Sequence, residues 1–258
     1  MPSCLLKVGE KMAISSANIV IENNEYKGGI EIKSTKATNS LGSISYMMIY
    51  RSYYNDIDSK VKLYEIALSS ANDLTFELLD ITSCSNHKYT YYIDLTNNNT
   101  STATILQSAT ISGIVCEFNG MFIGDYDKQY FAQLDVSTNA VQNTQVNYVT
   151  TLSSRTPYRV SNANTNYATG QSSGLFFETD ANNRLIVRDN RDYVNEIIAY
   201  LMDGNEKILK TSDGDIWYVS IDESASGQFN DRYKGKYEIQ FNWTEIGDVP
   251  TGKKIGVA

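Results

Sequence analysis

Two strand patterns joined by one Asp-Gly step constrain this chain more than any other feature. Apolar residues gather on both sides of Asp213-Gly214, in the segment that runs from Lys207 to Ile221. Asp-Gly can place both central residues of a type I′ turn at positive φ, and the twist of that turn matches the flanking strands. The segment therefore predicts a tight β-hairpin over residues 206–221.

A single amphipathic helix is predicted directly before this hairpin. Four apolar residues have the i, i+3, i+4 and i+7 spacing of one helical face, namely Val194, Ile197, Ile198 and Leu201. Asp192 is favourable near the positive end of the helix dipole, and Gly204 suits a left-handed stop. We expect a helix over residues 190–202 that packs its apolar stripe on a β-layer.

Length and charge exclude several classes of protein. The chain has 258 residues, enough for two domains of about 100–150 residues each. Its 22 Lys and Arg against 30 Asp and Glu give a net charge of -8 without a basic run, which disfavours nucleic-acid and anionic-membrane binding. No apolar stretch approaches the roughly 20 residues of a membrane span, and the first residues lack the apolar core of a secretory signal. We expect a protein made and retained in the cytoplasm.

Side chains that commonly carry catalysis or bind metals are sparse. His87, the only histidine, lies in a polar turn without a nucleophile elbow, which indicates a surface residue. No Cys-x-x-Cys pair occurs, so neither a zinc site nor a disulfide framework is expected from Cys4, Cys84 and Cys116. Three Asp-x-Asp pairs are better explained as turn residues than as cation ligands: Asp56 and Asp58, Asp125 and Asp127, Asp213 and Asp215. We therefore expect no enzymatic activity, no cofactor and no metal.

Strand patterns separated by turn residues fill the first half of the chain. From Ile44 to Ser52 the side chains alternate between two faces, and further strand patterns follow after short polar turns. Strands at this spacing are typical of a β-sandwich. Residues 1–11 are expected to form an N-terminal segment outside it.

The run Ile49-Tyr50-Arg51-Ser52, with Asp80 ahead of Tyr89-Thr90-Tyr91, resembles the fibronectin type III family. The resemblance implies a sandwich over residues 12–113, in which the hydroxyl of Tyr89 bonds to an upstream backbone group and fixes a corner. The chain departs from the family at Ile30-Glu31-Ile32-Lys33, where a core Trp is usual. Some other seven-stranded sandwich is the alternative.

A second domain is predicted over residues 114–258. Its first strands are expected to form a hairpin around Asn119-Gly120. Between Ser153 and Ser173 the chain is rich in Asn, Ser, Thr and Gly, which predicts a long loop. A loop of this length is either a binding or assembly element or a flexible surface loop, and the sequence leaves both open.

The last hundred residues present a distinctive order of elements. The run Leu152-Ser153-Ser154-Arg155-Thr156-Pro157 comes first, then the polar loop, a strand from Leu175 to Glu178, the helix, the hairpin, and the segment from Tyr237 to Trp243. This order resembles distal tail and baseplate proteins of bacteriophages that infect Gram-positive bacteria. The resemblance implies a tail-tube-like β-sandwich with one flanking helix, in a ring of usually six copies. The chain as a whole is thus expected to be mainly β, with two β-sandwich domains.

The resemblance also implies a structural role in a virion tail or baseplate, with assembly in the cytoplasm of the host bacterium. Expected partners are further copies of the chain in a ring and neighbouring tail or baseplate proteins, with a host surface glycan as a further candidate. Neither nucleic acid nor a membrane is required. The alternatives are a saccharide-binding or adhesin module, since 19 Tyr and 2 Trp could line a sugar platform, and a glycan hydrolase.

Six residues form the subunit interface that the resemblance predicts: Arg155, Pro157, Tyr158, Asp213, Gly214 and Trp217. The first three anchor the polar loop, and the Asp-Gly turn points a hairpin toward a neighbouring copy. An internal ion pair for Arg155 and a solvent-facing turn for Asp213 are the competing interpretations. A ring would also pair the open edges of each sandwich, which leaves no free edge for aggregation.

Overall fold

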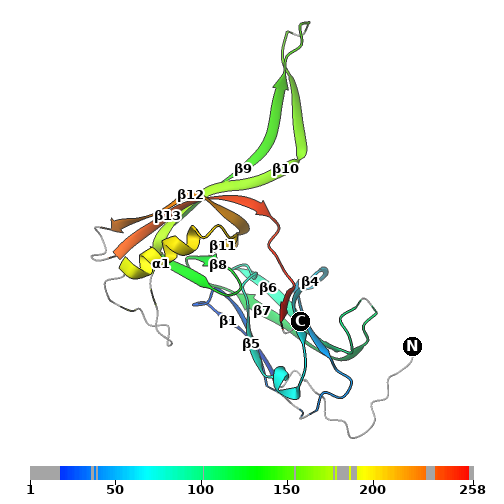
Figure 1. Ribbon diagram of the computed structural model, residues 1–258. Coiled ribbons are helices and arrows are strands. Elements are labelled where there is room, and N and C mark those ends of the chain that lie inside the picture. Colours follow the sequence, from blue (N-terminus) through cyan, green and yellow to red (C-terminus); the bar gives the residue numbers. More distant parts are fainter. Residues whose placement is uncertain are drawn as a thin grey trace. The chain divides into compact units, whose positions relative to one another are not determined.

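The chain folds into two units, and both consist mainly of β-strands. The computed structural model describes residues 18–35, 38, 40–100, 102–153, 155–176, 178, 186, 191–230 and 236–255 (Figure 1). One unit contains the chain up to Phe118 together with the stretch from Pro250, and the other runs from Asn119 to Val249. The predicted mainly β class is confirmed. The expected N-terminal segment 1–11 lies outside the described residues.

Two sheets build the N-terminal unit. The first has the order β1-β2-β5, and the second has the order β14-β4-β3-β6-β7. Their bounds are β1 Ile19–Asn24, β2 Gly29–Ser34, β3 Tyr46–Tyr53, β4 Asp56–Ala67, β5 Phe76–Asp80, β6 His87–Thr96, β7 Ile105–Cys116 and β14 Lys253–Ile255, with a short 3₁₀ helix, η2, at Ala71–Leu74. Buried residues on both sheets, such as Ile32 of β2 and Ile49 of β3, form the core of a sandwich.

A buried ion pair ties the two sheets together. Arg51 on β3 donates a hydrogen bond to Asp80 on β5 at 2.7 Å, and the hydroxyl of Tyr91 donates to the same carboxylate at 2.8 Å. Thr82 adds bonds from its backbone N–H and its hydroxyl. Burial raises the pKa of Asp80, but the Arg51 charge and these hydrogen bonds outweigh that effect and hold the pKa below its ordinary value.

Tyr89 fixes the corner between β5 and β6. Its hydroxyl accepts a hydrogen bond from the backbone N–H of Cys84, five residues upstream, at 2.9 Å. The guanidinium of Arg51 lies 4.7 Å from the centre of the Tyr89 ring. Tyr89 is fully buried, so the bond to Cys84 is needed to satisfy its hydroxyl.

The N-terminal sandwich includes a strand from the far end of the described sequence. β14 pairs with β4 in parallel, from Lys253 opposite Tyr64 to Ile255 opposite Ile66. We predicted a single domain over residues 114–258. Its last part is wrong, because the strand 253–255 belongs to the first unit. A strand of three residues is too short for its pattern to indicate which sheet it joins.

Six antiparallel strands close into a barrel in the C-terminal unit. The strand order around the barrel is β10-β13-β12-β11-β8-β9, and β9 pairs with β10 to close it. The bounds are β8 Met121–Gly124, β9 Gln129–Val149, β10 Tyr158–Phe176, β11 Lys207–Thr211, β12 Ile216–Asn230 and β13 Lys236–Gly247. The sheet is thus closed where we expected the open edges of a sandwich. The expected hairpin around Asn119-Gly120 is absent from the described pairings, because β7 pairs with β6 and β8 pairs with β9 and β11.

The helix α1, Arg191–Leu201, packs on β12 and β13 (Figure 1). Val194, Ile197 and Leu201 are buried in one core with Trp243 and other side chains of the barrel strands. Asp192 lies in the first turn, and Gly204 follows the helix at a φ of 80°. The spacing of apolar residues therefore located both the helix, for which we expected residues 190–202, and its buried face.

The hairpin of β11 and β12 exists, but its turn is not type I′. Gly214 has a φ of 99°, whereas Asp213 is not among the described residues with positive φ. The N–H of Gly214 donates to the carbonyl of Thr211 at 3.2 Å, and the N–H of Thr211 donates to the carbonyl of Asp215 at 3.0 Å. This is the pattern of a type I turn followed by a left-handed glycine, which adds one residue to the loop.

The lowered pKa of Asp80 predicts how the N-terminal unit responds to acid. Because the folded pKa lies below the unfolded value of about 3.9, the stability that Asp80 contributes is complete above that pH and is lost as the pH falls through the folded pKa. Asp80→Asn leaves the buried charge of Arg51 without its partner, so the free energy of unfolding at pH 7 should fall by about 3–5 kcal/mol. The variant should also lose this part of the acid dependence.

Amide hydrogen exchange of β3 and β6 at several pH values measures the effect. Both tryptophans, Trp217 and Trp243, lie in the barrel unit, so Trp fluorescence reports that unit separately. Asp58→Asn, at an exposed carboxylate of the same sandwich, is the matched control. Equal acid dependence in Asp80→Asn and the unchanged protein would contradict the assignment.

Candidate subunit interface

A long two-stranded ribbon extends from the barrel (Figure 1). Outward from the pair Gln142 and Ala168, β9 and β10 pair only with each other. We call residues 142–168 the arm. Most of the segment predicted as a polar loop, residues 153–173, is thus strand β10.

The arm has an unpaired outer edge on each strand. On one side β10 meets β13 only from Thr169 onward, and on the other side β9 leaves β8 after Ala132. The outer N–H and C=O groups of the arm therefore have no third strand among the described residues. Free edges of this kind are templates for pairing with another chain.

The end of the arm exposes large apolar side chains. Tyr148, Val149, Tyr158 and Val160 are between 48% and 69% exposed, and Leu152 in the turn is fully exposed. The register places Tyr158 opposite Val149, so that pair shares one face, while Tyr148 shares the other face with Arg159. Clustered apolar side chains at an exposed tip are typical of a surface that meets a partner.

The structure divides the six predicted interface residues between two places. Arg155 and Pro157 lie in the turn at the arm tip, and Tyr158 is the first residue of β10; all three are exposed. Arg155 has no ion pair with a described residue, so the internal pair considered for it is not formed there. The other three, Asp213, Gly214 and Trp217, belong to the β11–β12 hairpin.

A polar pocket lies beside that hairpin, which we call the base pocket. It measures about 700 Å³, and its lining includes Gln133, Asn139, Thr211, Asp213, Asp215 and Trp217. The residues from β9 come from the stretch just before the arm. Among the described lining residues none is Lys, Arg or His, so the pocket has an acidic character. The sequence pattern pairs Asp213 with Asp215, but nothing in the sequence indicates that residues of β9 lie beside them.

Trp217 packs against a second, buried tryptophan. Its ring centre lies 5.0 Å from that of Trp243, which is fully buried and donates from Nε1 to the hydroxyl of Ser172 at 3.0 Å. A Cβ on Gly170 would lie 2.5 Å from the Trp243 ring, so only glycine leaves room for that ring here. The second tryptophan thus gives the half-buried Trp217 a rigid support.

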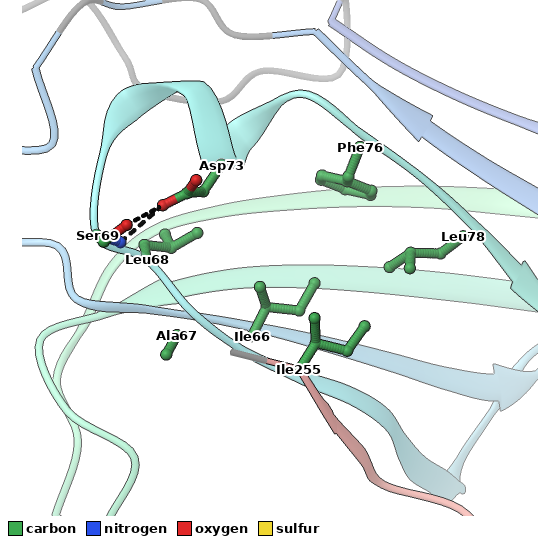
Figure 2. A pocket seen from close by; sticks show the side chains of 8 residues that line it. All are labelled: Ile66, Ala67, Leu68, Ser69, Asp73, Phe76, Leu78 and Ile255. Carbon is green, nitrogen blue, oxygen red and sulfur yellow. Dashed lines mark hydrogen bonds between the residues drawn. The ribbon is translucent and has the colours of Figure 1, made fainter. Parts of the chain in front are cut away.

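The N-terminal unit has an apolar pocket of about 400 Å³ between η2, β4, β5 and β14. Figure 2 shows Ile66, Leu68, Phe76, Leu78 and Ile255 around it. Its carboxylate, Asp73, accepts hydrogen bonds from the N–H and hydroxyl of Ser69 at 2.7 and 2.8 Å. The hydrogen bond from the backbone N–H of Ser70, together with these two from Ser69, holds the pKa of Asp73 below its ordinary value. The carboxylate is therefore occupied in capping η2.

The remaining chemical candidates form no site in the part of the chain that the structure describes. His87 is half-buried, with Nδ1 2.8 Å from the carbonyl of Ser85 and its ring beside Tyr53 and Tyr89. Cys84 and Cys116 are buried and form no disulfide with a described residue, and Cys4 lies outside the described residues. No group of three or more His, Cys, Asp or Glu that could hold a metal occurs there. Among the described helices, none has the length and hydrophobicity to span a membrane.

Two solved particle structures show partial likeness to this chain. One, the virion of a native gene transfer agent particle, has 17% identity and a TM-score of 0.30, over 50% of this chain and 92% of that chain. The other, the tail of an empty gene transfer agent particle with C6 symmetry, has 17% identity and a TM-score of 0.31, over 52% and 96%. Likeness at this level does not establish a common fold. No protein-family model and no curated protein sequence matches the chain.

The arm should be the least protected part of the C-terminal unit in a dilute monomer. A two-stranded ribbon is marginally stable in water, because neither face is covered and neither outer edge is paired. Backbone amides of residues 142–149 and 158–168 should therefore exchange with solvent at least ten times faster than those of β12 and β13. Hydrogen exchange read by mass spectrometry measures this directly. Equal protection of arm and barrel in a verified monomer would show that the ribbon is stable by itself.

Proposed function

We propose that this chain is a structural component of a bacteriophage-like tail or baseplate, which assembles as a ring through its C-terminal unit. The arm is the observation that carries the proposal. It exposes five large apolar side chains and two open strand edges on one narrow ribbon. The sequence resemblance to distal tail and baseplate proteins supplies the class of assembly.

Association would remove a cost that the isolated chain bears. Burying the apolar tip is worth about 25 cal/mol for each Å² removed from water, and pairing the outer edges satisfies backbone groups. When the arm of one copy binds a different surface on the barrel of the next copy, the contact is head-to-tail. Such contacts close into a ring when the rotation from one copy to the next permits it. Six copies remain the expected number from the resemblance.

In this proposal the N-terminal unit decorates the ring and contacts other tail proteins or the host surface. Its sheet orders, β1-β2-β5 against β4-β3-β6-β7, and the hydrogen bond that Cys84 donates to Tyr89 support the resemblance to fibronectin type III domains. We assign it no catalytic activity. In this role it is a folded spacer within the assembly.

The base pocket favours one alternative, a saccharide-binding module. Trp217 offers a supported ring, and Asn139, Asp213 and Asp215 offer the planar polar groups that bind sugar hydroxyls. In that case the monomer would bind glycans with or without the arm. A glycan array probed with monomeric protein separates this alternative from the ring.

Assembly of the purified full chain tests the proposal. Size-exclusion chromatography with light scattering, followed by negative-stain microscopy, should reveal a closed ring at micromolar concentration. Replacing residues 144–166 by a two-residue Asn-Gly turn joins Asn143 to Tyr167, which lie opposite each other in the register. The shortened chain should be a folded monomer, because the barrel pairings of β9 and β10 lie outside the replaced range.

Trp fluorescence and thermal unfolding serve as the control that the shortened barrel is intact. A matched variant, Leu152→Ser with Tyr158→Ser, keeps the arm but removes two of its apolar side chains, and it should weaken association at least ten-fold. A chain that remains monomeric at all concentrations, alone and with tail proteins, would end the proposal.

A further inference from the structure

We propose that the base pocket of one copy receives the arm tip of the next copy, with Arg155 and Arg159 facing Asp213 and Asp215. This inference rests on the proposed function and names the two surfaces that meet. The partner is a second copy of this chain. The contact is directional, from the tip of one molecule to the barrel of another.

Charge is separated between the two surfaces. The chain carries a net charge of -8, yet residues 136–177 contain no Asp or Glu and two arginines, Arg155 and Arg159. Both arginines are exposed, and neither makes an ion pair with a described residue. The arm therefore carries a net positive charge within an acidic protein. Complementary charge of this kind directs association and sets the register of the contact.

The base pocket supplies the matching groups. Asp213 and Asp215 are exposed, and neither side chain bonds to a described residue. Trp217 lines the pocket together with both carboxylates and packs against Trp243, and an arginine side chain can stack on such a ring while its guanidinium meets a carboxylate. Thr211 adds a buried hydroxyl without a hydrogen-bond partner among the described residues.

An open strand edge runs along the same pocket. Five lining residues belong to β9 between Gln133 and Ala140, where β9 pairs with β10 on one side and has no described partner on the other. An arriving arm strand can add to that edge through backbone hydrogen bonds. The pocket thus offers both a strand edge and carboxylates to one incoming ribbon.

The arm cannot reach the pocket of its own chain. Val149 lies nine residues beyond Ala140 along β9, which is about 30 Å at the rise of a β-strand. Because the ribbon runs outward from the pocket, its tip arginines stay far from Asp213 and Asp215 of the same molecule. The complementary surfaces can be satisfied only between copies, and a contact between two different surfaces is head-to-tail.

Charge reversal in the full chain tests the contact. Arg155→Glu with Arg159→Glu, and separately Asp213→Lys with Asp215→Lys, should each weaken self-association at least ten-fold in analytical ultracentrifugation. An equimolar mixture of the two variants should restore association, because each tip then meets a pocket of opposite charge in an alternating ring. Raising the salt concentration from 0.15 M to 1 M should also weaken the self-association of the unchanged protein, because it shortens the Debye length from about 8 to 3 Å.

Asp127→Lys with Glu206→Lys, at two exposed carboxylates that do not line the base pocket, is the charge-matched control and should associate normally. Thermal unfolding establishes that each variant is folded, and Asp213→Asn with Asp215→Asn is a milder second variant of the turn. If the unchanged protein forms rings that both reversals leave intact, this inference is overturned and the proposed function stands. If the unchanged protein never associates, the proposed function itself fails. Restored association in the mixture is the result that a general loss of folding could not produce.

Discussion

Every strand in a sheet presents backbone hydrogen-bonding groups on two sides, and each side needs a neighbouring strand to pair with. The organisation of the C-terminal unit follows from where such neighbours are present and where they are not. Six strands meet it by closing into a barrel. Beyond Ala132 on one side and Thr169 on the other, the same two strands continue without outer neighbours. The unpaired strand edges of the C-terminal unit therefore lie along β9 after Ala132 and along β10 before Thr169, which directs pairing with another chain to the arm and to the β9 edge beside the base pocket.

The elements that the sequence located correctly are those that bury one face. The helix has a stripe of apolar residues because α1 covers a core, and the Asp-Gly turn follows β11, all five residues of which are buried. In the N-terminal unit, β1 begins with the same alternation of buried and exposed residues, whereas Met47, Met48 and Ile49 of β3 are all buried. The predicted type I′ turn was nevertheless wrong, because Gly214 has a positive φ and Asp213 does not.

The elements that the sequence missed have no buried face or no local signal. The arm strand β10 reads as a loop because its polar residues need not alternate when both faces are solvated. Closure of the barrel depends on pairings such as β10 with β13, between segments far apart in the chain. For the same reason the base pocket could not be foreseen, although two of its carboxylates and Trp217 were already singled out. Spacing along the chain identified the participants but not their neighbours.

The parallel strand β14 has a consequence for biosynthesis. Its partner β4 is translated early, whereas residues 253–255 emerge only after all of the chain from Asn119 to Val249. At 5–20 residues per second, the ribosome leaves that border of the nascent sandwich uncovered for roughly 7 to 26 s. A chaperone thus has time to act before the first unit of the polypeptide is complete.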